Sequence, residues 1–305
     1  MKNILLHEVG LRDGLQMEAL TVPTDQKLRW LRTLMNTGVD IIQVGSFVHP
    51  GRVPQMADTD RLFAELAASG EKPSNVTLSG LVLNEKGLER GLACGVEMFC
   101  MGVSASETHS RKNTGMGVAE ATGRIIAMAQ EAGAAGKRVQ VSVQSAFGCG
   151  YEGDVPEERV LAIVRRYLDA GLKEISLADT AGHALPDQVE RMFSAVAASG
   201  GADLDMTCHF HNTYGLGLVN AYAALKAGAG TCESSVAGLG GCPFTKIAGG
   251  NVCTEDLVHM LRNMGFRRDV KLDRIVGVAQ DMAKFFGREL PGTVYRTGTL
   301  EVTRT

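Results

Sequence analysis

The sequence predicts a (β/α)8 barrel, a closed parallel sheet surrounded by helices. Short runs rich in β-branched and apolar residues alternate with segments that carry apolar residues at three- and four-residue spacing. Eight such alternations match the length of a barrel, about 250 residues. An open doubly wound sheet is less favoured, because no GxGxxG motif follows the first strand. We expect one catalytic domain over residues 1–305, with the barrel over about 1–253 and additional helices and a tail over 254–305.

The expected elements follow one another in regular order. The predicted strands cover residues 4–8, 40–44, 77–82, 97–103, 138–143, 174–177, 204–209 and 231–235. The predicted helices cover residues 24–37, 61–69, 118–135, 156–170, 186–198 and 217–227, and two or three more follow residue 254. Pro156 opens one helix, and glycines such as Gly38, Gly136 and Gly171 close others, as is typical of helix ends.

Composition excludes several classes of protein. The chain is 45% hydrophobic, and its 31 basic and 34 acidic residues leave a net charge of −3. These values argue against disorder and against nucleic-acid binding by bulk charge. The chain has no apolar run of about 18 residues, so we expect no membrane span. The start MKNILLHEVG does not resemble a signal or transit peptide, and the seven cysteines form no CxxC pair, so we expect a cytoplasmic protein with reduced thiols.

In a barrel of this class, the active groups lie at the carboxyl ends of the strands and in the loops after them. The chemically unusual residues of this chain fall at those places. They are Arg12 and Asp13 after the first strand, Gln43 and Ser46 at the end of the second, Asp179 after the sixth, His209 and His211 at the end of the seventh, and the glycine-rich run 238–251 after the eighth.

The strongest local signal is the pair His209 and His211. Residues at i and i+2 of a strand point to the same face, so both imidazoles can bind one metal ion. Asp13 is the natural third ligand, and Asn251 could add an amide oxygen. This mixed oxygen and nitrogen set suits Mg or Mn, with Zn, Fe or Co as alternatives. Two unrelated histidines, an Asx turn at Asp13 and a turn or cap at Asn251 remain open.

Three further residues could take part in the chemistry. Arg12 could hold a substrate carboxylate or stabilise an enolate oxygen, although it could also form a surface salt bridge. Glu8 could support the metal site or belong to a buried ion pair. Cys242, in the glycine-rich stretch AGLGGCPF, could act as an acid or base on a closing loop, or could be a structural thiol like the other six cysteines.

A basic cluster follows the fourth strand. Arg111, Lys112 and Asn113 lie on what we expect to be a loop at the active face. They could hold the phosphate groups of a large substrate, and a solvated run of charges is an equally good interpretation.

Six stretches of the chain match one known family. They are HEVGLRDGLQMEA (7–19), SFVHPGRVPQMAD (46–58), FGCGYEG (147–153), LADTAG (177–182), HFHNTYGLGLVNAYAAL (209–225) and SSVAGLGGCPFTKIAGGNVCTEDLVHML (234–261). In this order and spacing, the sequence resembles the 3-hydroxy-3-methylglutaryl-CoA lyase family, part of the metal-dependent lyase and synthase superfamily on the TIM barrel, as a divergent member.

The resemblance implies an oxo-acid lyase that cleaves a 3-hydroxy-3-methylglutaryl-type thioester to acetyl-CoA and a keto acid. It implies that Arg12 stabilises the enolate and that Cys242 is the mobile acid or base. It also implies a homodimer or larger homo-oligomer, a role in leucine catabolism, and coenzyme A as part of the substrate. The implied ligands of a divalent metal are Asp13, His209, His211 and Asn251.

The chain departs from the family pattern at two catalytic-face positions. Gln43 stands where the lyases carry a catalytic glutamate, and an amide cannot exchange a proton at neutral pH. Asn212 stands where the lyases usually carry aspartate, as in the related acyl-CoA-condensing synthases. A Claisen-type synthase and a catalytically impaired CoA- and metal-binding homologue therefore remain alternatives to the lyase. A pyruvate carboxyltransferase is disfavoured, because no strand carries a lysine suited to carboxylation.

Overall fold

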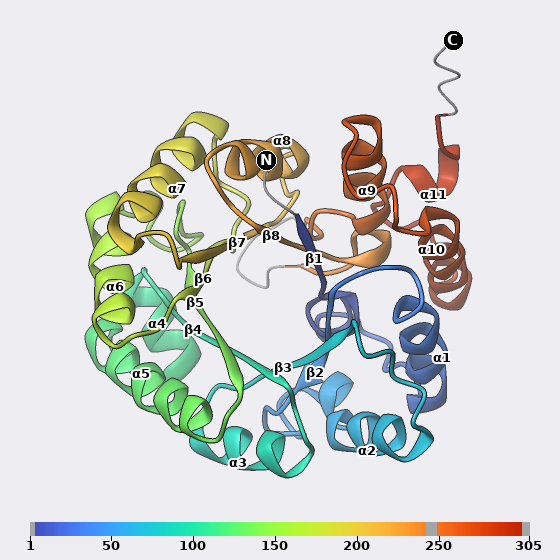
Figure 1. Cartoon of the computed structure of the whole chain (residues 1–305), viewed down its shortest axis with the longest axis horizontal. Helices are drawn as coiled ribbons and strands as arrows, with labels where there is room; N and C mark the ends of the chain where they lie inside the picture. Colours follow the sequence, from blue (N-terminus) through green and yellow to red (C-terminus); the bar gives the residue numbers. More distant parts are fainter. Residues whose placement is uncertain (1–3, 242–248, 301–305) are drawn as a thin grey trace.

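A computed structural model describes residues 4–241 and 249–300 as a closed barrel of eight parallel strands (Figure 1). The strands pair in sequence order and β1 closes the ring against β8, so the predicted fold class is confirmed and the open sheet is excluded. Their bounds are β1 Leu5–Glu8, β2 Ile41–Ser46, β3 Thr77–Leu81, β4 Met98–Ser104, β5 Arg138–Gln144, β6 Glu174–Asp179, β7 Asp205–Phe210 and β8 Thr231–Ser234.

The helices surround this barrel and connect its strands. They are α1 Thr24–Leu34, α2 Thr59–Ser69, α3 Glu85–Ala93, α4 Glu107–Thr114, α5 Val118–Ala134, α6 Glu157–Asp169, α7 Pro186–Gly200 and α8 Gly217–Lys226. After the barrel come α9 Thr254–Asn263, α10 Leu272–Phe286 and α11 Val294–Thr297. None of the described helices has the length and apolar character needed to cross a membrane.

The six helices expected within the barrel are all present, but the sequence analysis missed α3 and α4. Two glycines interrupt the apolar pattern of α3, and α4 has no apolar stripe, because its sequence is ETHSRKNT. Ser106 is the N-cap of helix α4, and its hydroxyl accepts a hydrogen bond from the backbone N–H of His109. Polar capping therefore replaces apolar periodicity as the signal for this helix.

Apolar side chains fill the space between the barrel and its helices, whereas the inside of the barrel is polar. Along β1 and β2, the buried apolar residues Leu6 and Ile42 alternate with the buried polar residues His7 and Gln43. Successive side chains of a strand face opposite sides of the sheet, so the polar set shares the interior. Interiors of such barrels are usually filled by branched apolar side chains, whereas the polar interior here provides hydrogen bonds below the carboxyl ends of the strands.

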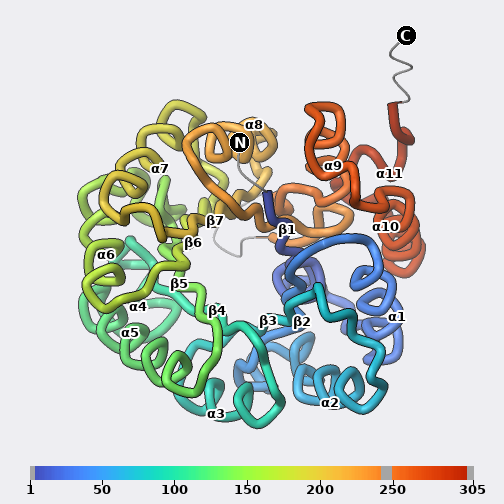
Figure 2. The backbone as a smooth tube through the Cα atoms, in the orientation of Figure 1, coloured from blue at the N-terminus to red at the C-terminus, as the bar shows by residue number. Residues whose placement is uncertain are grey.

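The C-terminal helices lie on the outside of the barrel, next to its closure. Helix α10 packs beside α1 (Figure 2). The indole Nε1 of Trp30 on α1 donates to the Asp281 carboxylate on α10 at 2.7 Å, and the ring of Trp30 meets that of Phe285 edge-on. Helix α10 thus packs against the first β/α unit, whose loop after β1 carries Arg12 and Asp13.

Candidate active site

A turn of π-helix, Gly10–Gly14, places Arg12 and Asp13 at the mouth of the barrel. The carbonyl of Val9 accepts hydrogen bonds from the N–H groups of Arg12, Asp13 and Gly14. Both glycines are needed, because a Cβ on Gly10 would lie 2.5 Å from the Glu8 carboxylate and one on Gly14 would lie close to a serine hydroxyl. Residues larger than glycine therefore cannot occupy positions 10 and 14 of this turn.

Glu8 links this turn to residues that follow strand β8. Its Oε1 accepts from the N–H groups of Gly10 at 2.7 Å and Val236 at 2.9 Å, and its Oε2 accepts from the Thr254 hydroxyl. Burial raises the pKa of Glu8 to about 7 despite these hydrogen bonds. All of these partners are neutral donors, so Glu8 has a structural role and the ion pair considered from the sequence is not what holds it.

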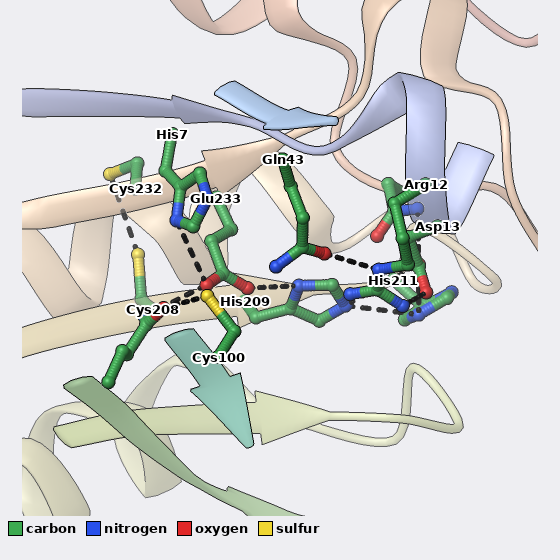
Figure 3. A network of polar contacts seen from close by, with 12 residues as sticks. His7, Arg12, Asp13, Gln43, Cys100, Cys208, His209, His211, Cys232 and Glu233 are labelled. Atoms are coloured by element: carbon green, nitrogen blue, oxygen red, sulfur yellow. Dashed lines mark hydrogen bonds and ion pairs between the residues drawn. The ribbon is translucent and has the colours of Figure 1, made fainter. Parts of the chain in front are cut away.

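Asp13, His209 and His211 converge at one point of the mouth, where one ligand atom from each lies within 4.8 Å of the others. The two Nε2 atoms are 3.3 Å apart, and Oδ2 of Asp13 lies 3.9 Å from that of His209 and 3.7 Å from that of His211 (Figure 3). Asn251 borders the group, because its Nδ2 donates to Oδ2 of Asp13 at 2.8 Å. The structure thus brings together all four residues expected at a metal site.

The protonation states of Asp13 and His211 suit the binding of a cation. Burial alone would raise the pKa of Asp13, but the charges of Arg12, His209 and His211 lower it to about 2. Burial, assisted by the charge of His209, lowers the pKa of His211 to about 4, so this imidazole is neutral near pH 7. An ionised carboxylate beside a neutral imidazole is the donor set that divalent cations require. The described residues therefore fit a divalent metal.

Arg12 is held in place by two neighbours. Its Nε donates to the amide oxygen of Gln43, and its Nη1 donates to the Asp13 carboxylate. Gln43 is buried inside the barrel on β2, whereas the Arg12 side chain stays partly exposed at the cavity. In this protein Gln43 orients the guanidinium without adding a negative charge.

A cavity of about 440 Å³ opens above and between these residues. Arg12, Asp13, His209 and His211 line it, and it continues into the polar barrel interior. Its remaining lining includes two kinds of residue that the sequence analysis missed. Besides the two histidines of the Asp13, His209 and His211 group, the basic side chains of the lining are His49, Arg52, His109 and Arg124. The polar residues of the interior are Cys100, Gln140, Ser142, Ser176 and Glu233.

The prediction that Arg111, Lys112 and Asn113 lie on a loop is wrong, because all three lie in helix α4. Of these three, Asn113 lines the cavity. The Arg111 guanidinium lies 3.7 Å from the Glu107 carboxylate, and the Lys112 ammonium lies 3.8 Å from the centre of the Tyr151 ring. Ser106 caps this helix, and its polar sequence lacks the apolar periodicity that predicts a helix.

Three other residues singled out from the sequence have different outcomes. Asp179 ends β6, where its carboxylate accepts from the backbone N–H groups of His183 and Ala184, so it shapes a loop. Asn212 accepts from the N–H of Gly217 at the start of α8. Cys242 lies outside the described residues.

Comparison with known proteins assigns the chain to a family. The family model described as HMGL-like matches residues 3–282, nearly the entire described chain. The chain belongs to the HMGL-like family. This agrees with the motifs and with the fold on which they lie.

Its HMGL-like relatives include curated lyases of similar length. The chain is 37% identical over 290 residues to hydroxymethylglutaryl-CoA lyase YngG of Bacillus subtilis, covering 95% of each. It is 36% identical over 287 residues to the 3-hydroxy-3-isohexenylglutaryl-CoA/hydroxy-methylglutaryl-CoA lyase of Pseudomonas aeruginosa, covering 94% of each.

A solved HMGL-like structure also matches the whole fold. An HMG-CoA lyase from Acinetobacter baumannii, in complex with coenzyme A and 3-methylmalate, superposes with a TM-score of 0.92 at 33% identity. The alignment covers 99% of this chain and 97% of that one.

Proposed function

We propose that this HMGL-like protein is a divalent-metal-dependent carbon–carbon lyase. Its substrate is a 3-hydroxy-3-methylglutaryl-CoA-type thioester, and its products are acetyl-CoA and a keto acid. The observation that carries the proposal is the convergence of Asp13, His209 and His211 beside Arg12 in one cavity. The lyase relatives and the coenzyme A complex of the Acinetobacter protein support the same reaction class.

In this proposal four residues hold the metal, which is Mg²⁺ or Mn²⁺. They are Asp13, His209 and His211, with the amide of Asn251. When bound, a divalent cation polarises the hydroxyl and carboxyl oxygens of the substrate. The low pKa of Asp13 keeps its carboxylate ionised over the working range of pH.

Arg12 stabilises the negative charge that appears as the carbon–carbon bond breaks. Scission leaves an enolate on the departing acetyl-CoA, and a fixed positive charge beside the enolate oxygen lowers the barrier. The bonds to Gln43 and Asp13 use only two of the five N–H donors of the guanidinium, which leaves donors for the substrate. Preorganisation of Arg12 by Gln43 is thus part of catalysis.

Other side chains complete the proposal. Cys242 delivers the proton to the enolate carbon, because this carbon needs an acid and the residue belongs to the GLGGCP stretch. Arg111, Lys112 and Asn113 contact the phosphates of coenzyme A from α4. We further propose that the enzyme is a cytoplasmic homodimer that serves leucine catabolism.

The direct test is release of acetyl-CoA from 3-hydroxy-3-methylglutaryl-CoA by the purified full-length protein. We expect turnover with added Mg²⁺ or Mn²⁺, loss of turnover with EDTA, and recovery when the cation is restored in excess. A panel of other 3-hydroxyacyl-CoA esters, assayed in parallel, identifies the preferred acyl group. Absence of acetyl-CoA from every ester in the presence of either cation would contradict the lyase proposal.

Gln43→Glu tests whether the missing carboxylate limits the rate. We expect kcat on 3-hydroxy-3-methylglutaryl-CoA to rise about tenfold or more, because a carboxylate can take part in proton transfer and the amide cannot. Steady-state kcat and KM of both proteins provide the measurement. An unchanged or lower kcat in a folded variant would show that the missing carboxylate does not limit the rate.

A further inference from the structure

We propose that Glu233 is a positioning residue for the metal site, a role that rests on the proposed metal-dependent function. Its carboxylate holds His209 with the proton on Nδ1 and directs the Nε2 lone pair toward Asp13 and His211. Gln140 in turn donates to the carboxylate from inside the barrel, and His7 lies beside it. Figure 3 shows Glu233 lying between His7 and His209.

The contact between His209 and Glu233 is built into the sheet. The two residues are register partners on the adjacent strands β7 and β8. Nδ1 of His209 lies 2.7 Å from Oε2 of Glu233. An ionised carboxylate only accepts hydrogen bonds, so the proton of a neutral His209 must be on Nδ1. Its Nε2 then carries the lone pair, and this is the atom that lies 3.3 Å from Nε2 of His211.

The second oxygen of Glu233 has its own partners. Oε1 accepts from Nε2 of Gln140 at 2.9 Å and lies 3.3 Å from Nδ1 of His7. Nε2 of His7 lies 2.8 Å from the Ser79 hydroxyl. These residues come from four strands, β1, β3, β5 and β8, and His7 and Ser79 are fully buried. The Glu233 carboxylate is therefore restrained from several directions.

This restraint matters for metal binding. A histidine that binds a metal through one nitrogen usually donates from the other to a carboxylate, and loss of that partner typically weakens metal affinity about 10–100-fold. Asp179, a second buried carboxylate near the barrel mouth, is occupied by two backbone N–H groups. Among the residues that the structure describes, Glu233 is the carboxylate bonded to Nδ1 of His209.

The wild-type protein provides the first test. Long-range ¹H–¹⁵N spectra of the metal-free, full-length protein report the tautomer of each histidine, and a His209→Gln spectrum identifies the His209 signals. We expect the Nδ1–H form for His209 in spectra recorded at a pH where this imidazole is neutral. Observation of the Nε2–H form would overturn the proposal without recourse to any variant of Glu233.

The second test uses Glu233→Gln, with Glu233→Asp as the conservative variant. Calorimetric titration with Mn²⁺ should show about 10–100-fold weaker binding for Glu233→Gln at unchanged stoichiometry, with affinity partly restored by Glu233→Asp. The matched control is Glu174→Gln, because Glu174 begins β6 and pairs with Arg138 on the neighbouring strand. Its Mn²⁺ affinity should equal that of the wild type.

The outcomes separate this inference from the proposed function. If Glu233→Gln folds and binds Mn²⁺ within about threefold of wild type, the positioning role is wrong and the lyase proposal stands. If the wild type binds Mn²⁺ but cleaves no thioester, the lyase proposal fails and the positioning role is unaffected. If Glu233→Gln and Glu174→Gln lose Mn²⁺ affinity equally, the effect is a general one on the barrel and the inference is overturned.

Discussion

Asp13→Asn is expected to abolish stoichiometric Mn²⁺ binding, with at least about 100-fold weaker affinity in calorimetric titration. The substitution removes the ionised carboxylate of the Asp13, His209 and His211 cluster while preserving size. Divalent cations of this kind depend on a charged oxygen ligand, whereas a neutral amide offers only a dipole. Turnover should be lost together with binding.

The control for this variant is Asp205→Asn. Asp205 is an exposed carboxylate at the start of β7, the strand that carries His209 at its other end. Its substitution should leave both Mn²⁺ affinity and kcat unchanged. Stoichiometric binding of Mn²⁺ by Asp13→Asn with wild-type affinity would refute the assignment of Asp13 as a ligand.

Arg12→Gln should lower kcat about 10²–10³-fold, the range found when one preorganised donor to a developing oxyanion is removed. Mn²⁺ affinity should change little, because Arg12 donates to Asp13 and carries no ligand atom itself. Arg12→Lys separates charge from shape: it keeps the cation but loses the planar fork that reaches both Gln43 and Asp13.

Three measurements decide the role of Arg12: kcat, KM and Mn²⁺ affinity for each variant. A loss confined to KM would mean that Arg12 holds the ground-state substrate and does not stabilise the enolate. A kcat for Arg12→Gln equal to that of the wild type would remove Arg12 from the chemistry.

Much of the site could be predicted because a closed barrel places the carboxyl ends of consecutive strands next to one another. His209 and His211 are two residues apart on one strand, so their common orientation follows from local geometry. Asp13 follows the first strand and Asn251 follows the eighth, and these strands are adjacent in a closed barrel. Once the sequence indicates eight strands in order, the four residues must share one rim.

The supporting residues could not be predicted in the same way. The contact between Glu233 and His209 depends on the register of β7 against β8, and that of Glu233 with Gln140 depends on a side chain reaching across the barrel interior. Neither has a local signature, because each residue is an ordinary polar residue on its own strand. The helix that holds Asn113 was missed for a related reason, since its stability comes from capping and tertiary contacts rather than from an apolar stripe.

The bond between Asn251 and Asp13 joins positions 238 residues apart, and Glu8 bonds to Val236 and Thr254 across a similar separation. A polypeptide emerging from the ribosome therefore presents Asp13 long before its partners have been synthesised. Fragments that end before β7 hold one of the four proposed ligands, so the proposed cation site can form only after β7 and the residues that follow β8 have been synthesised.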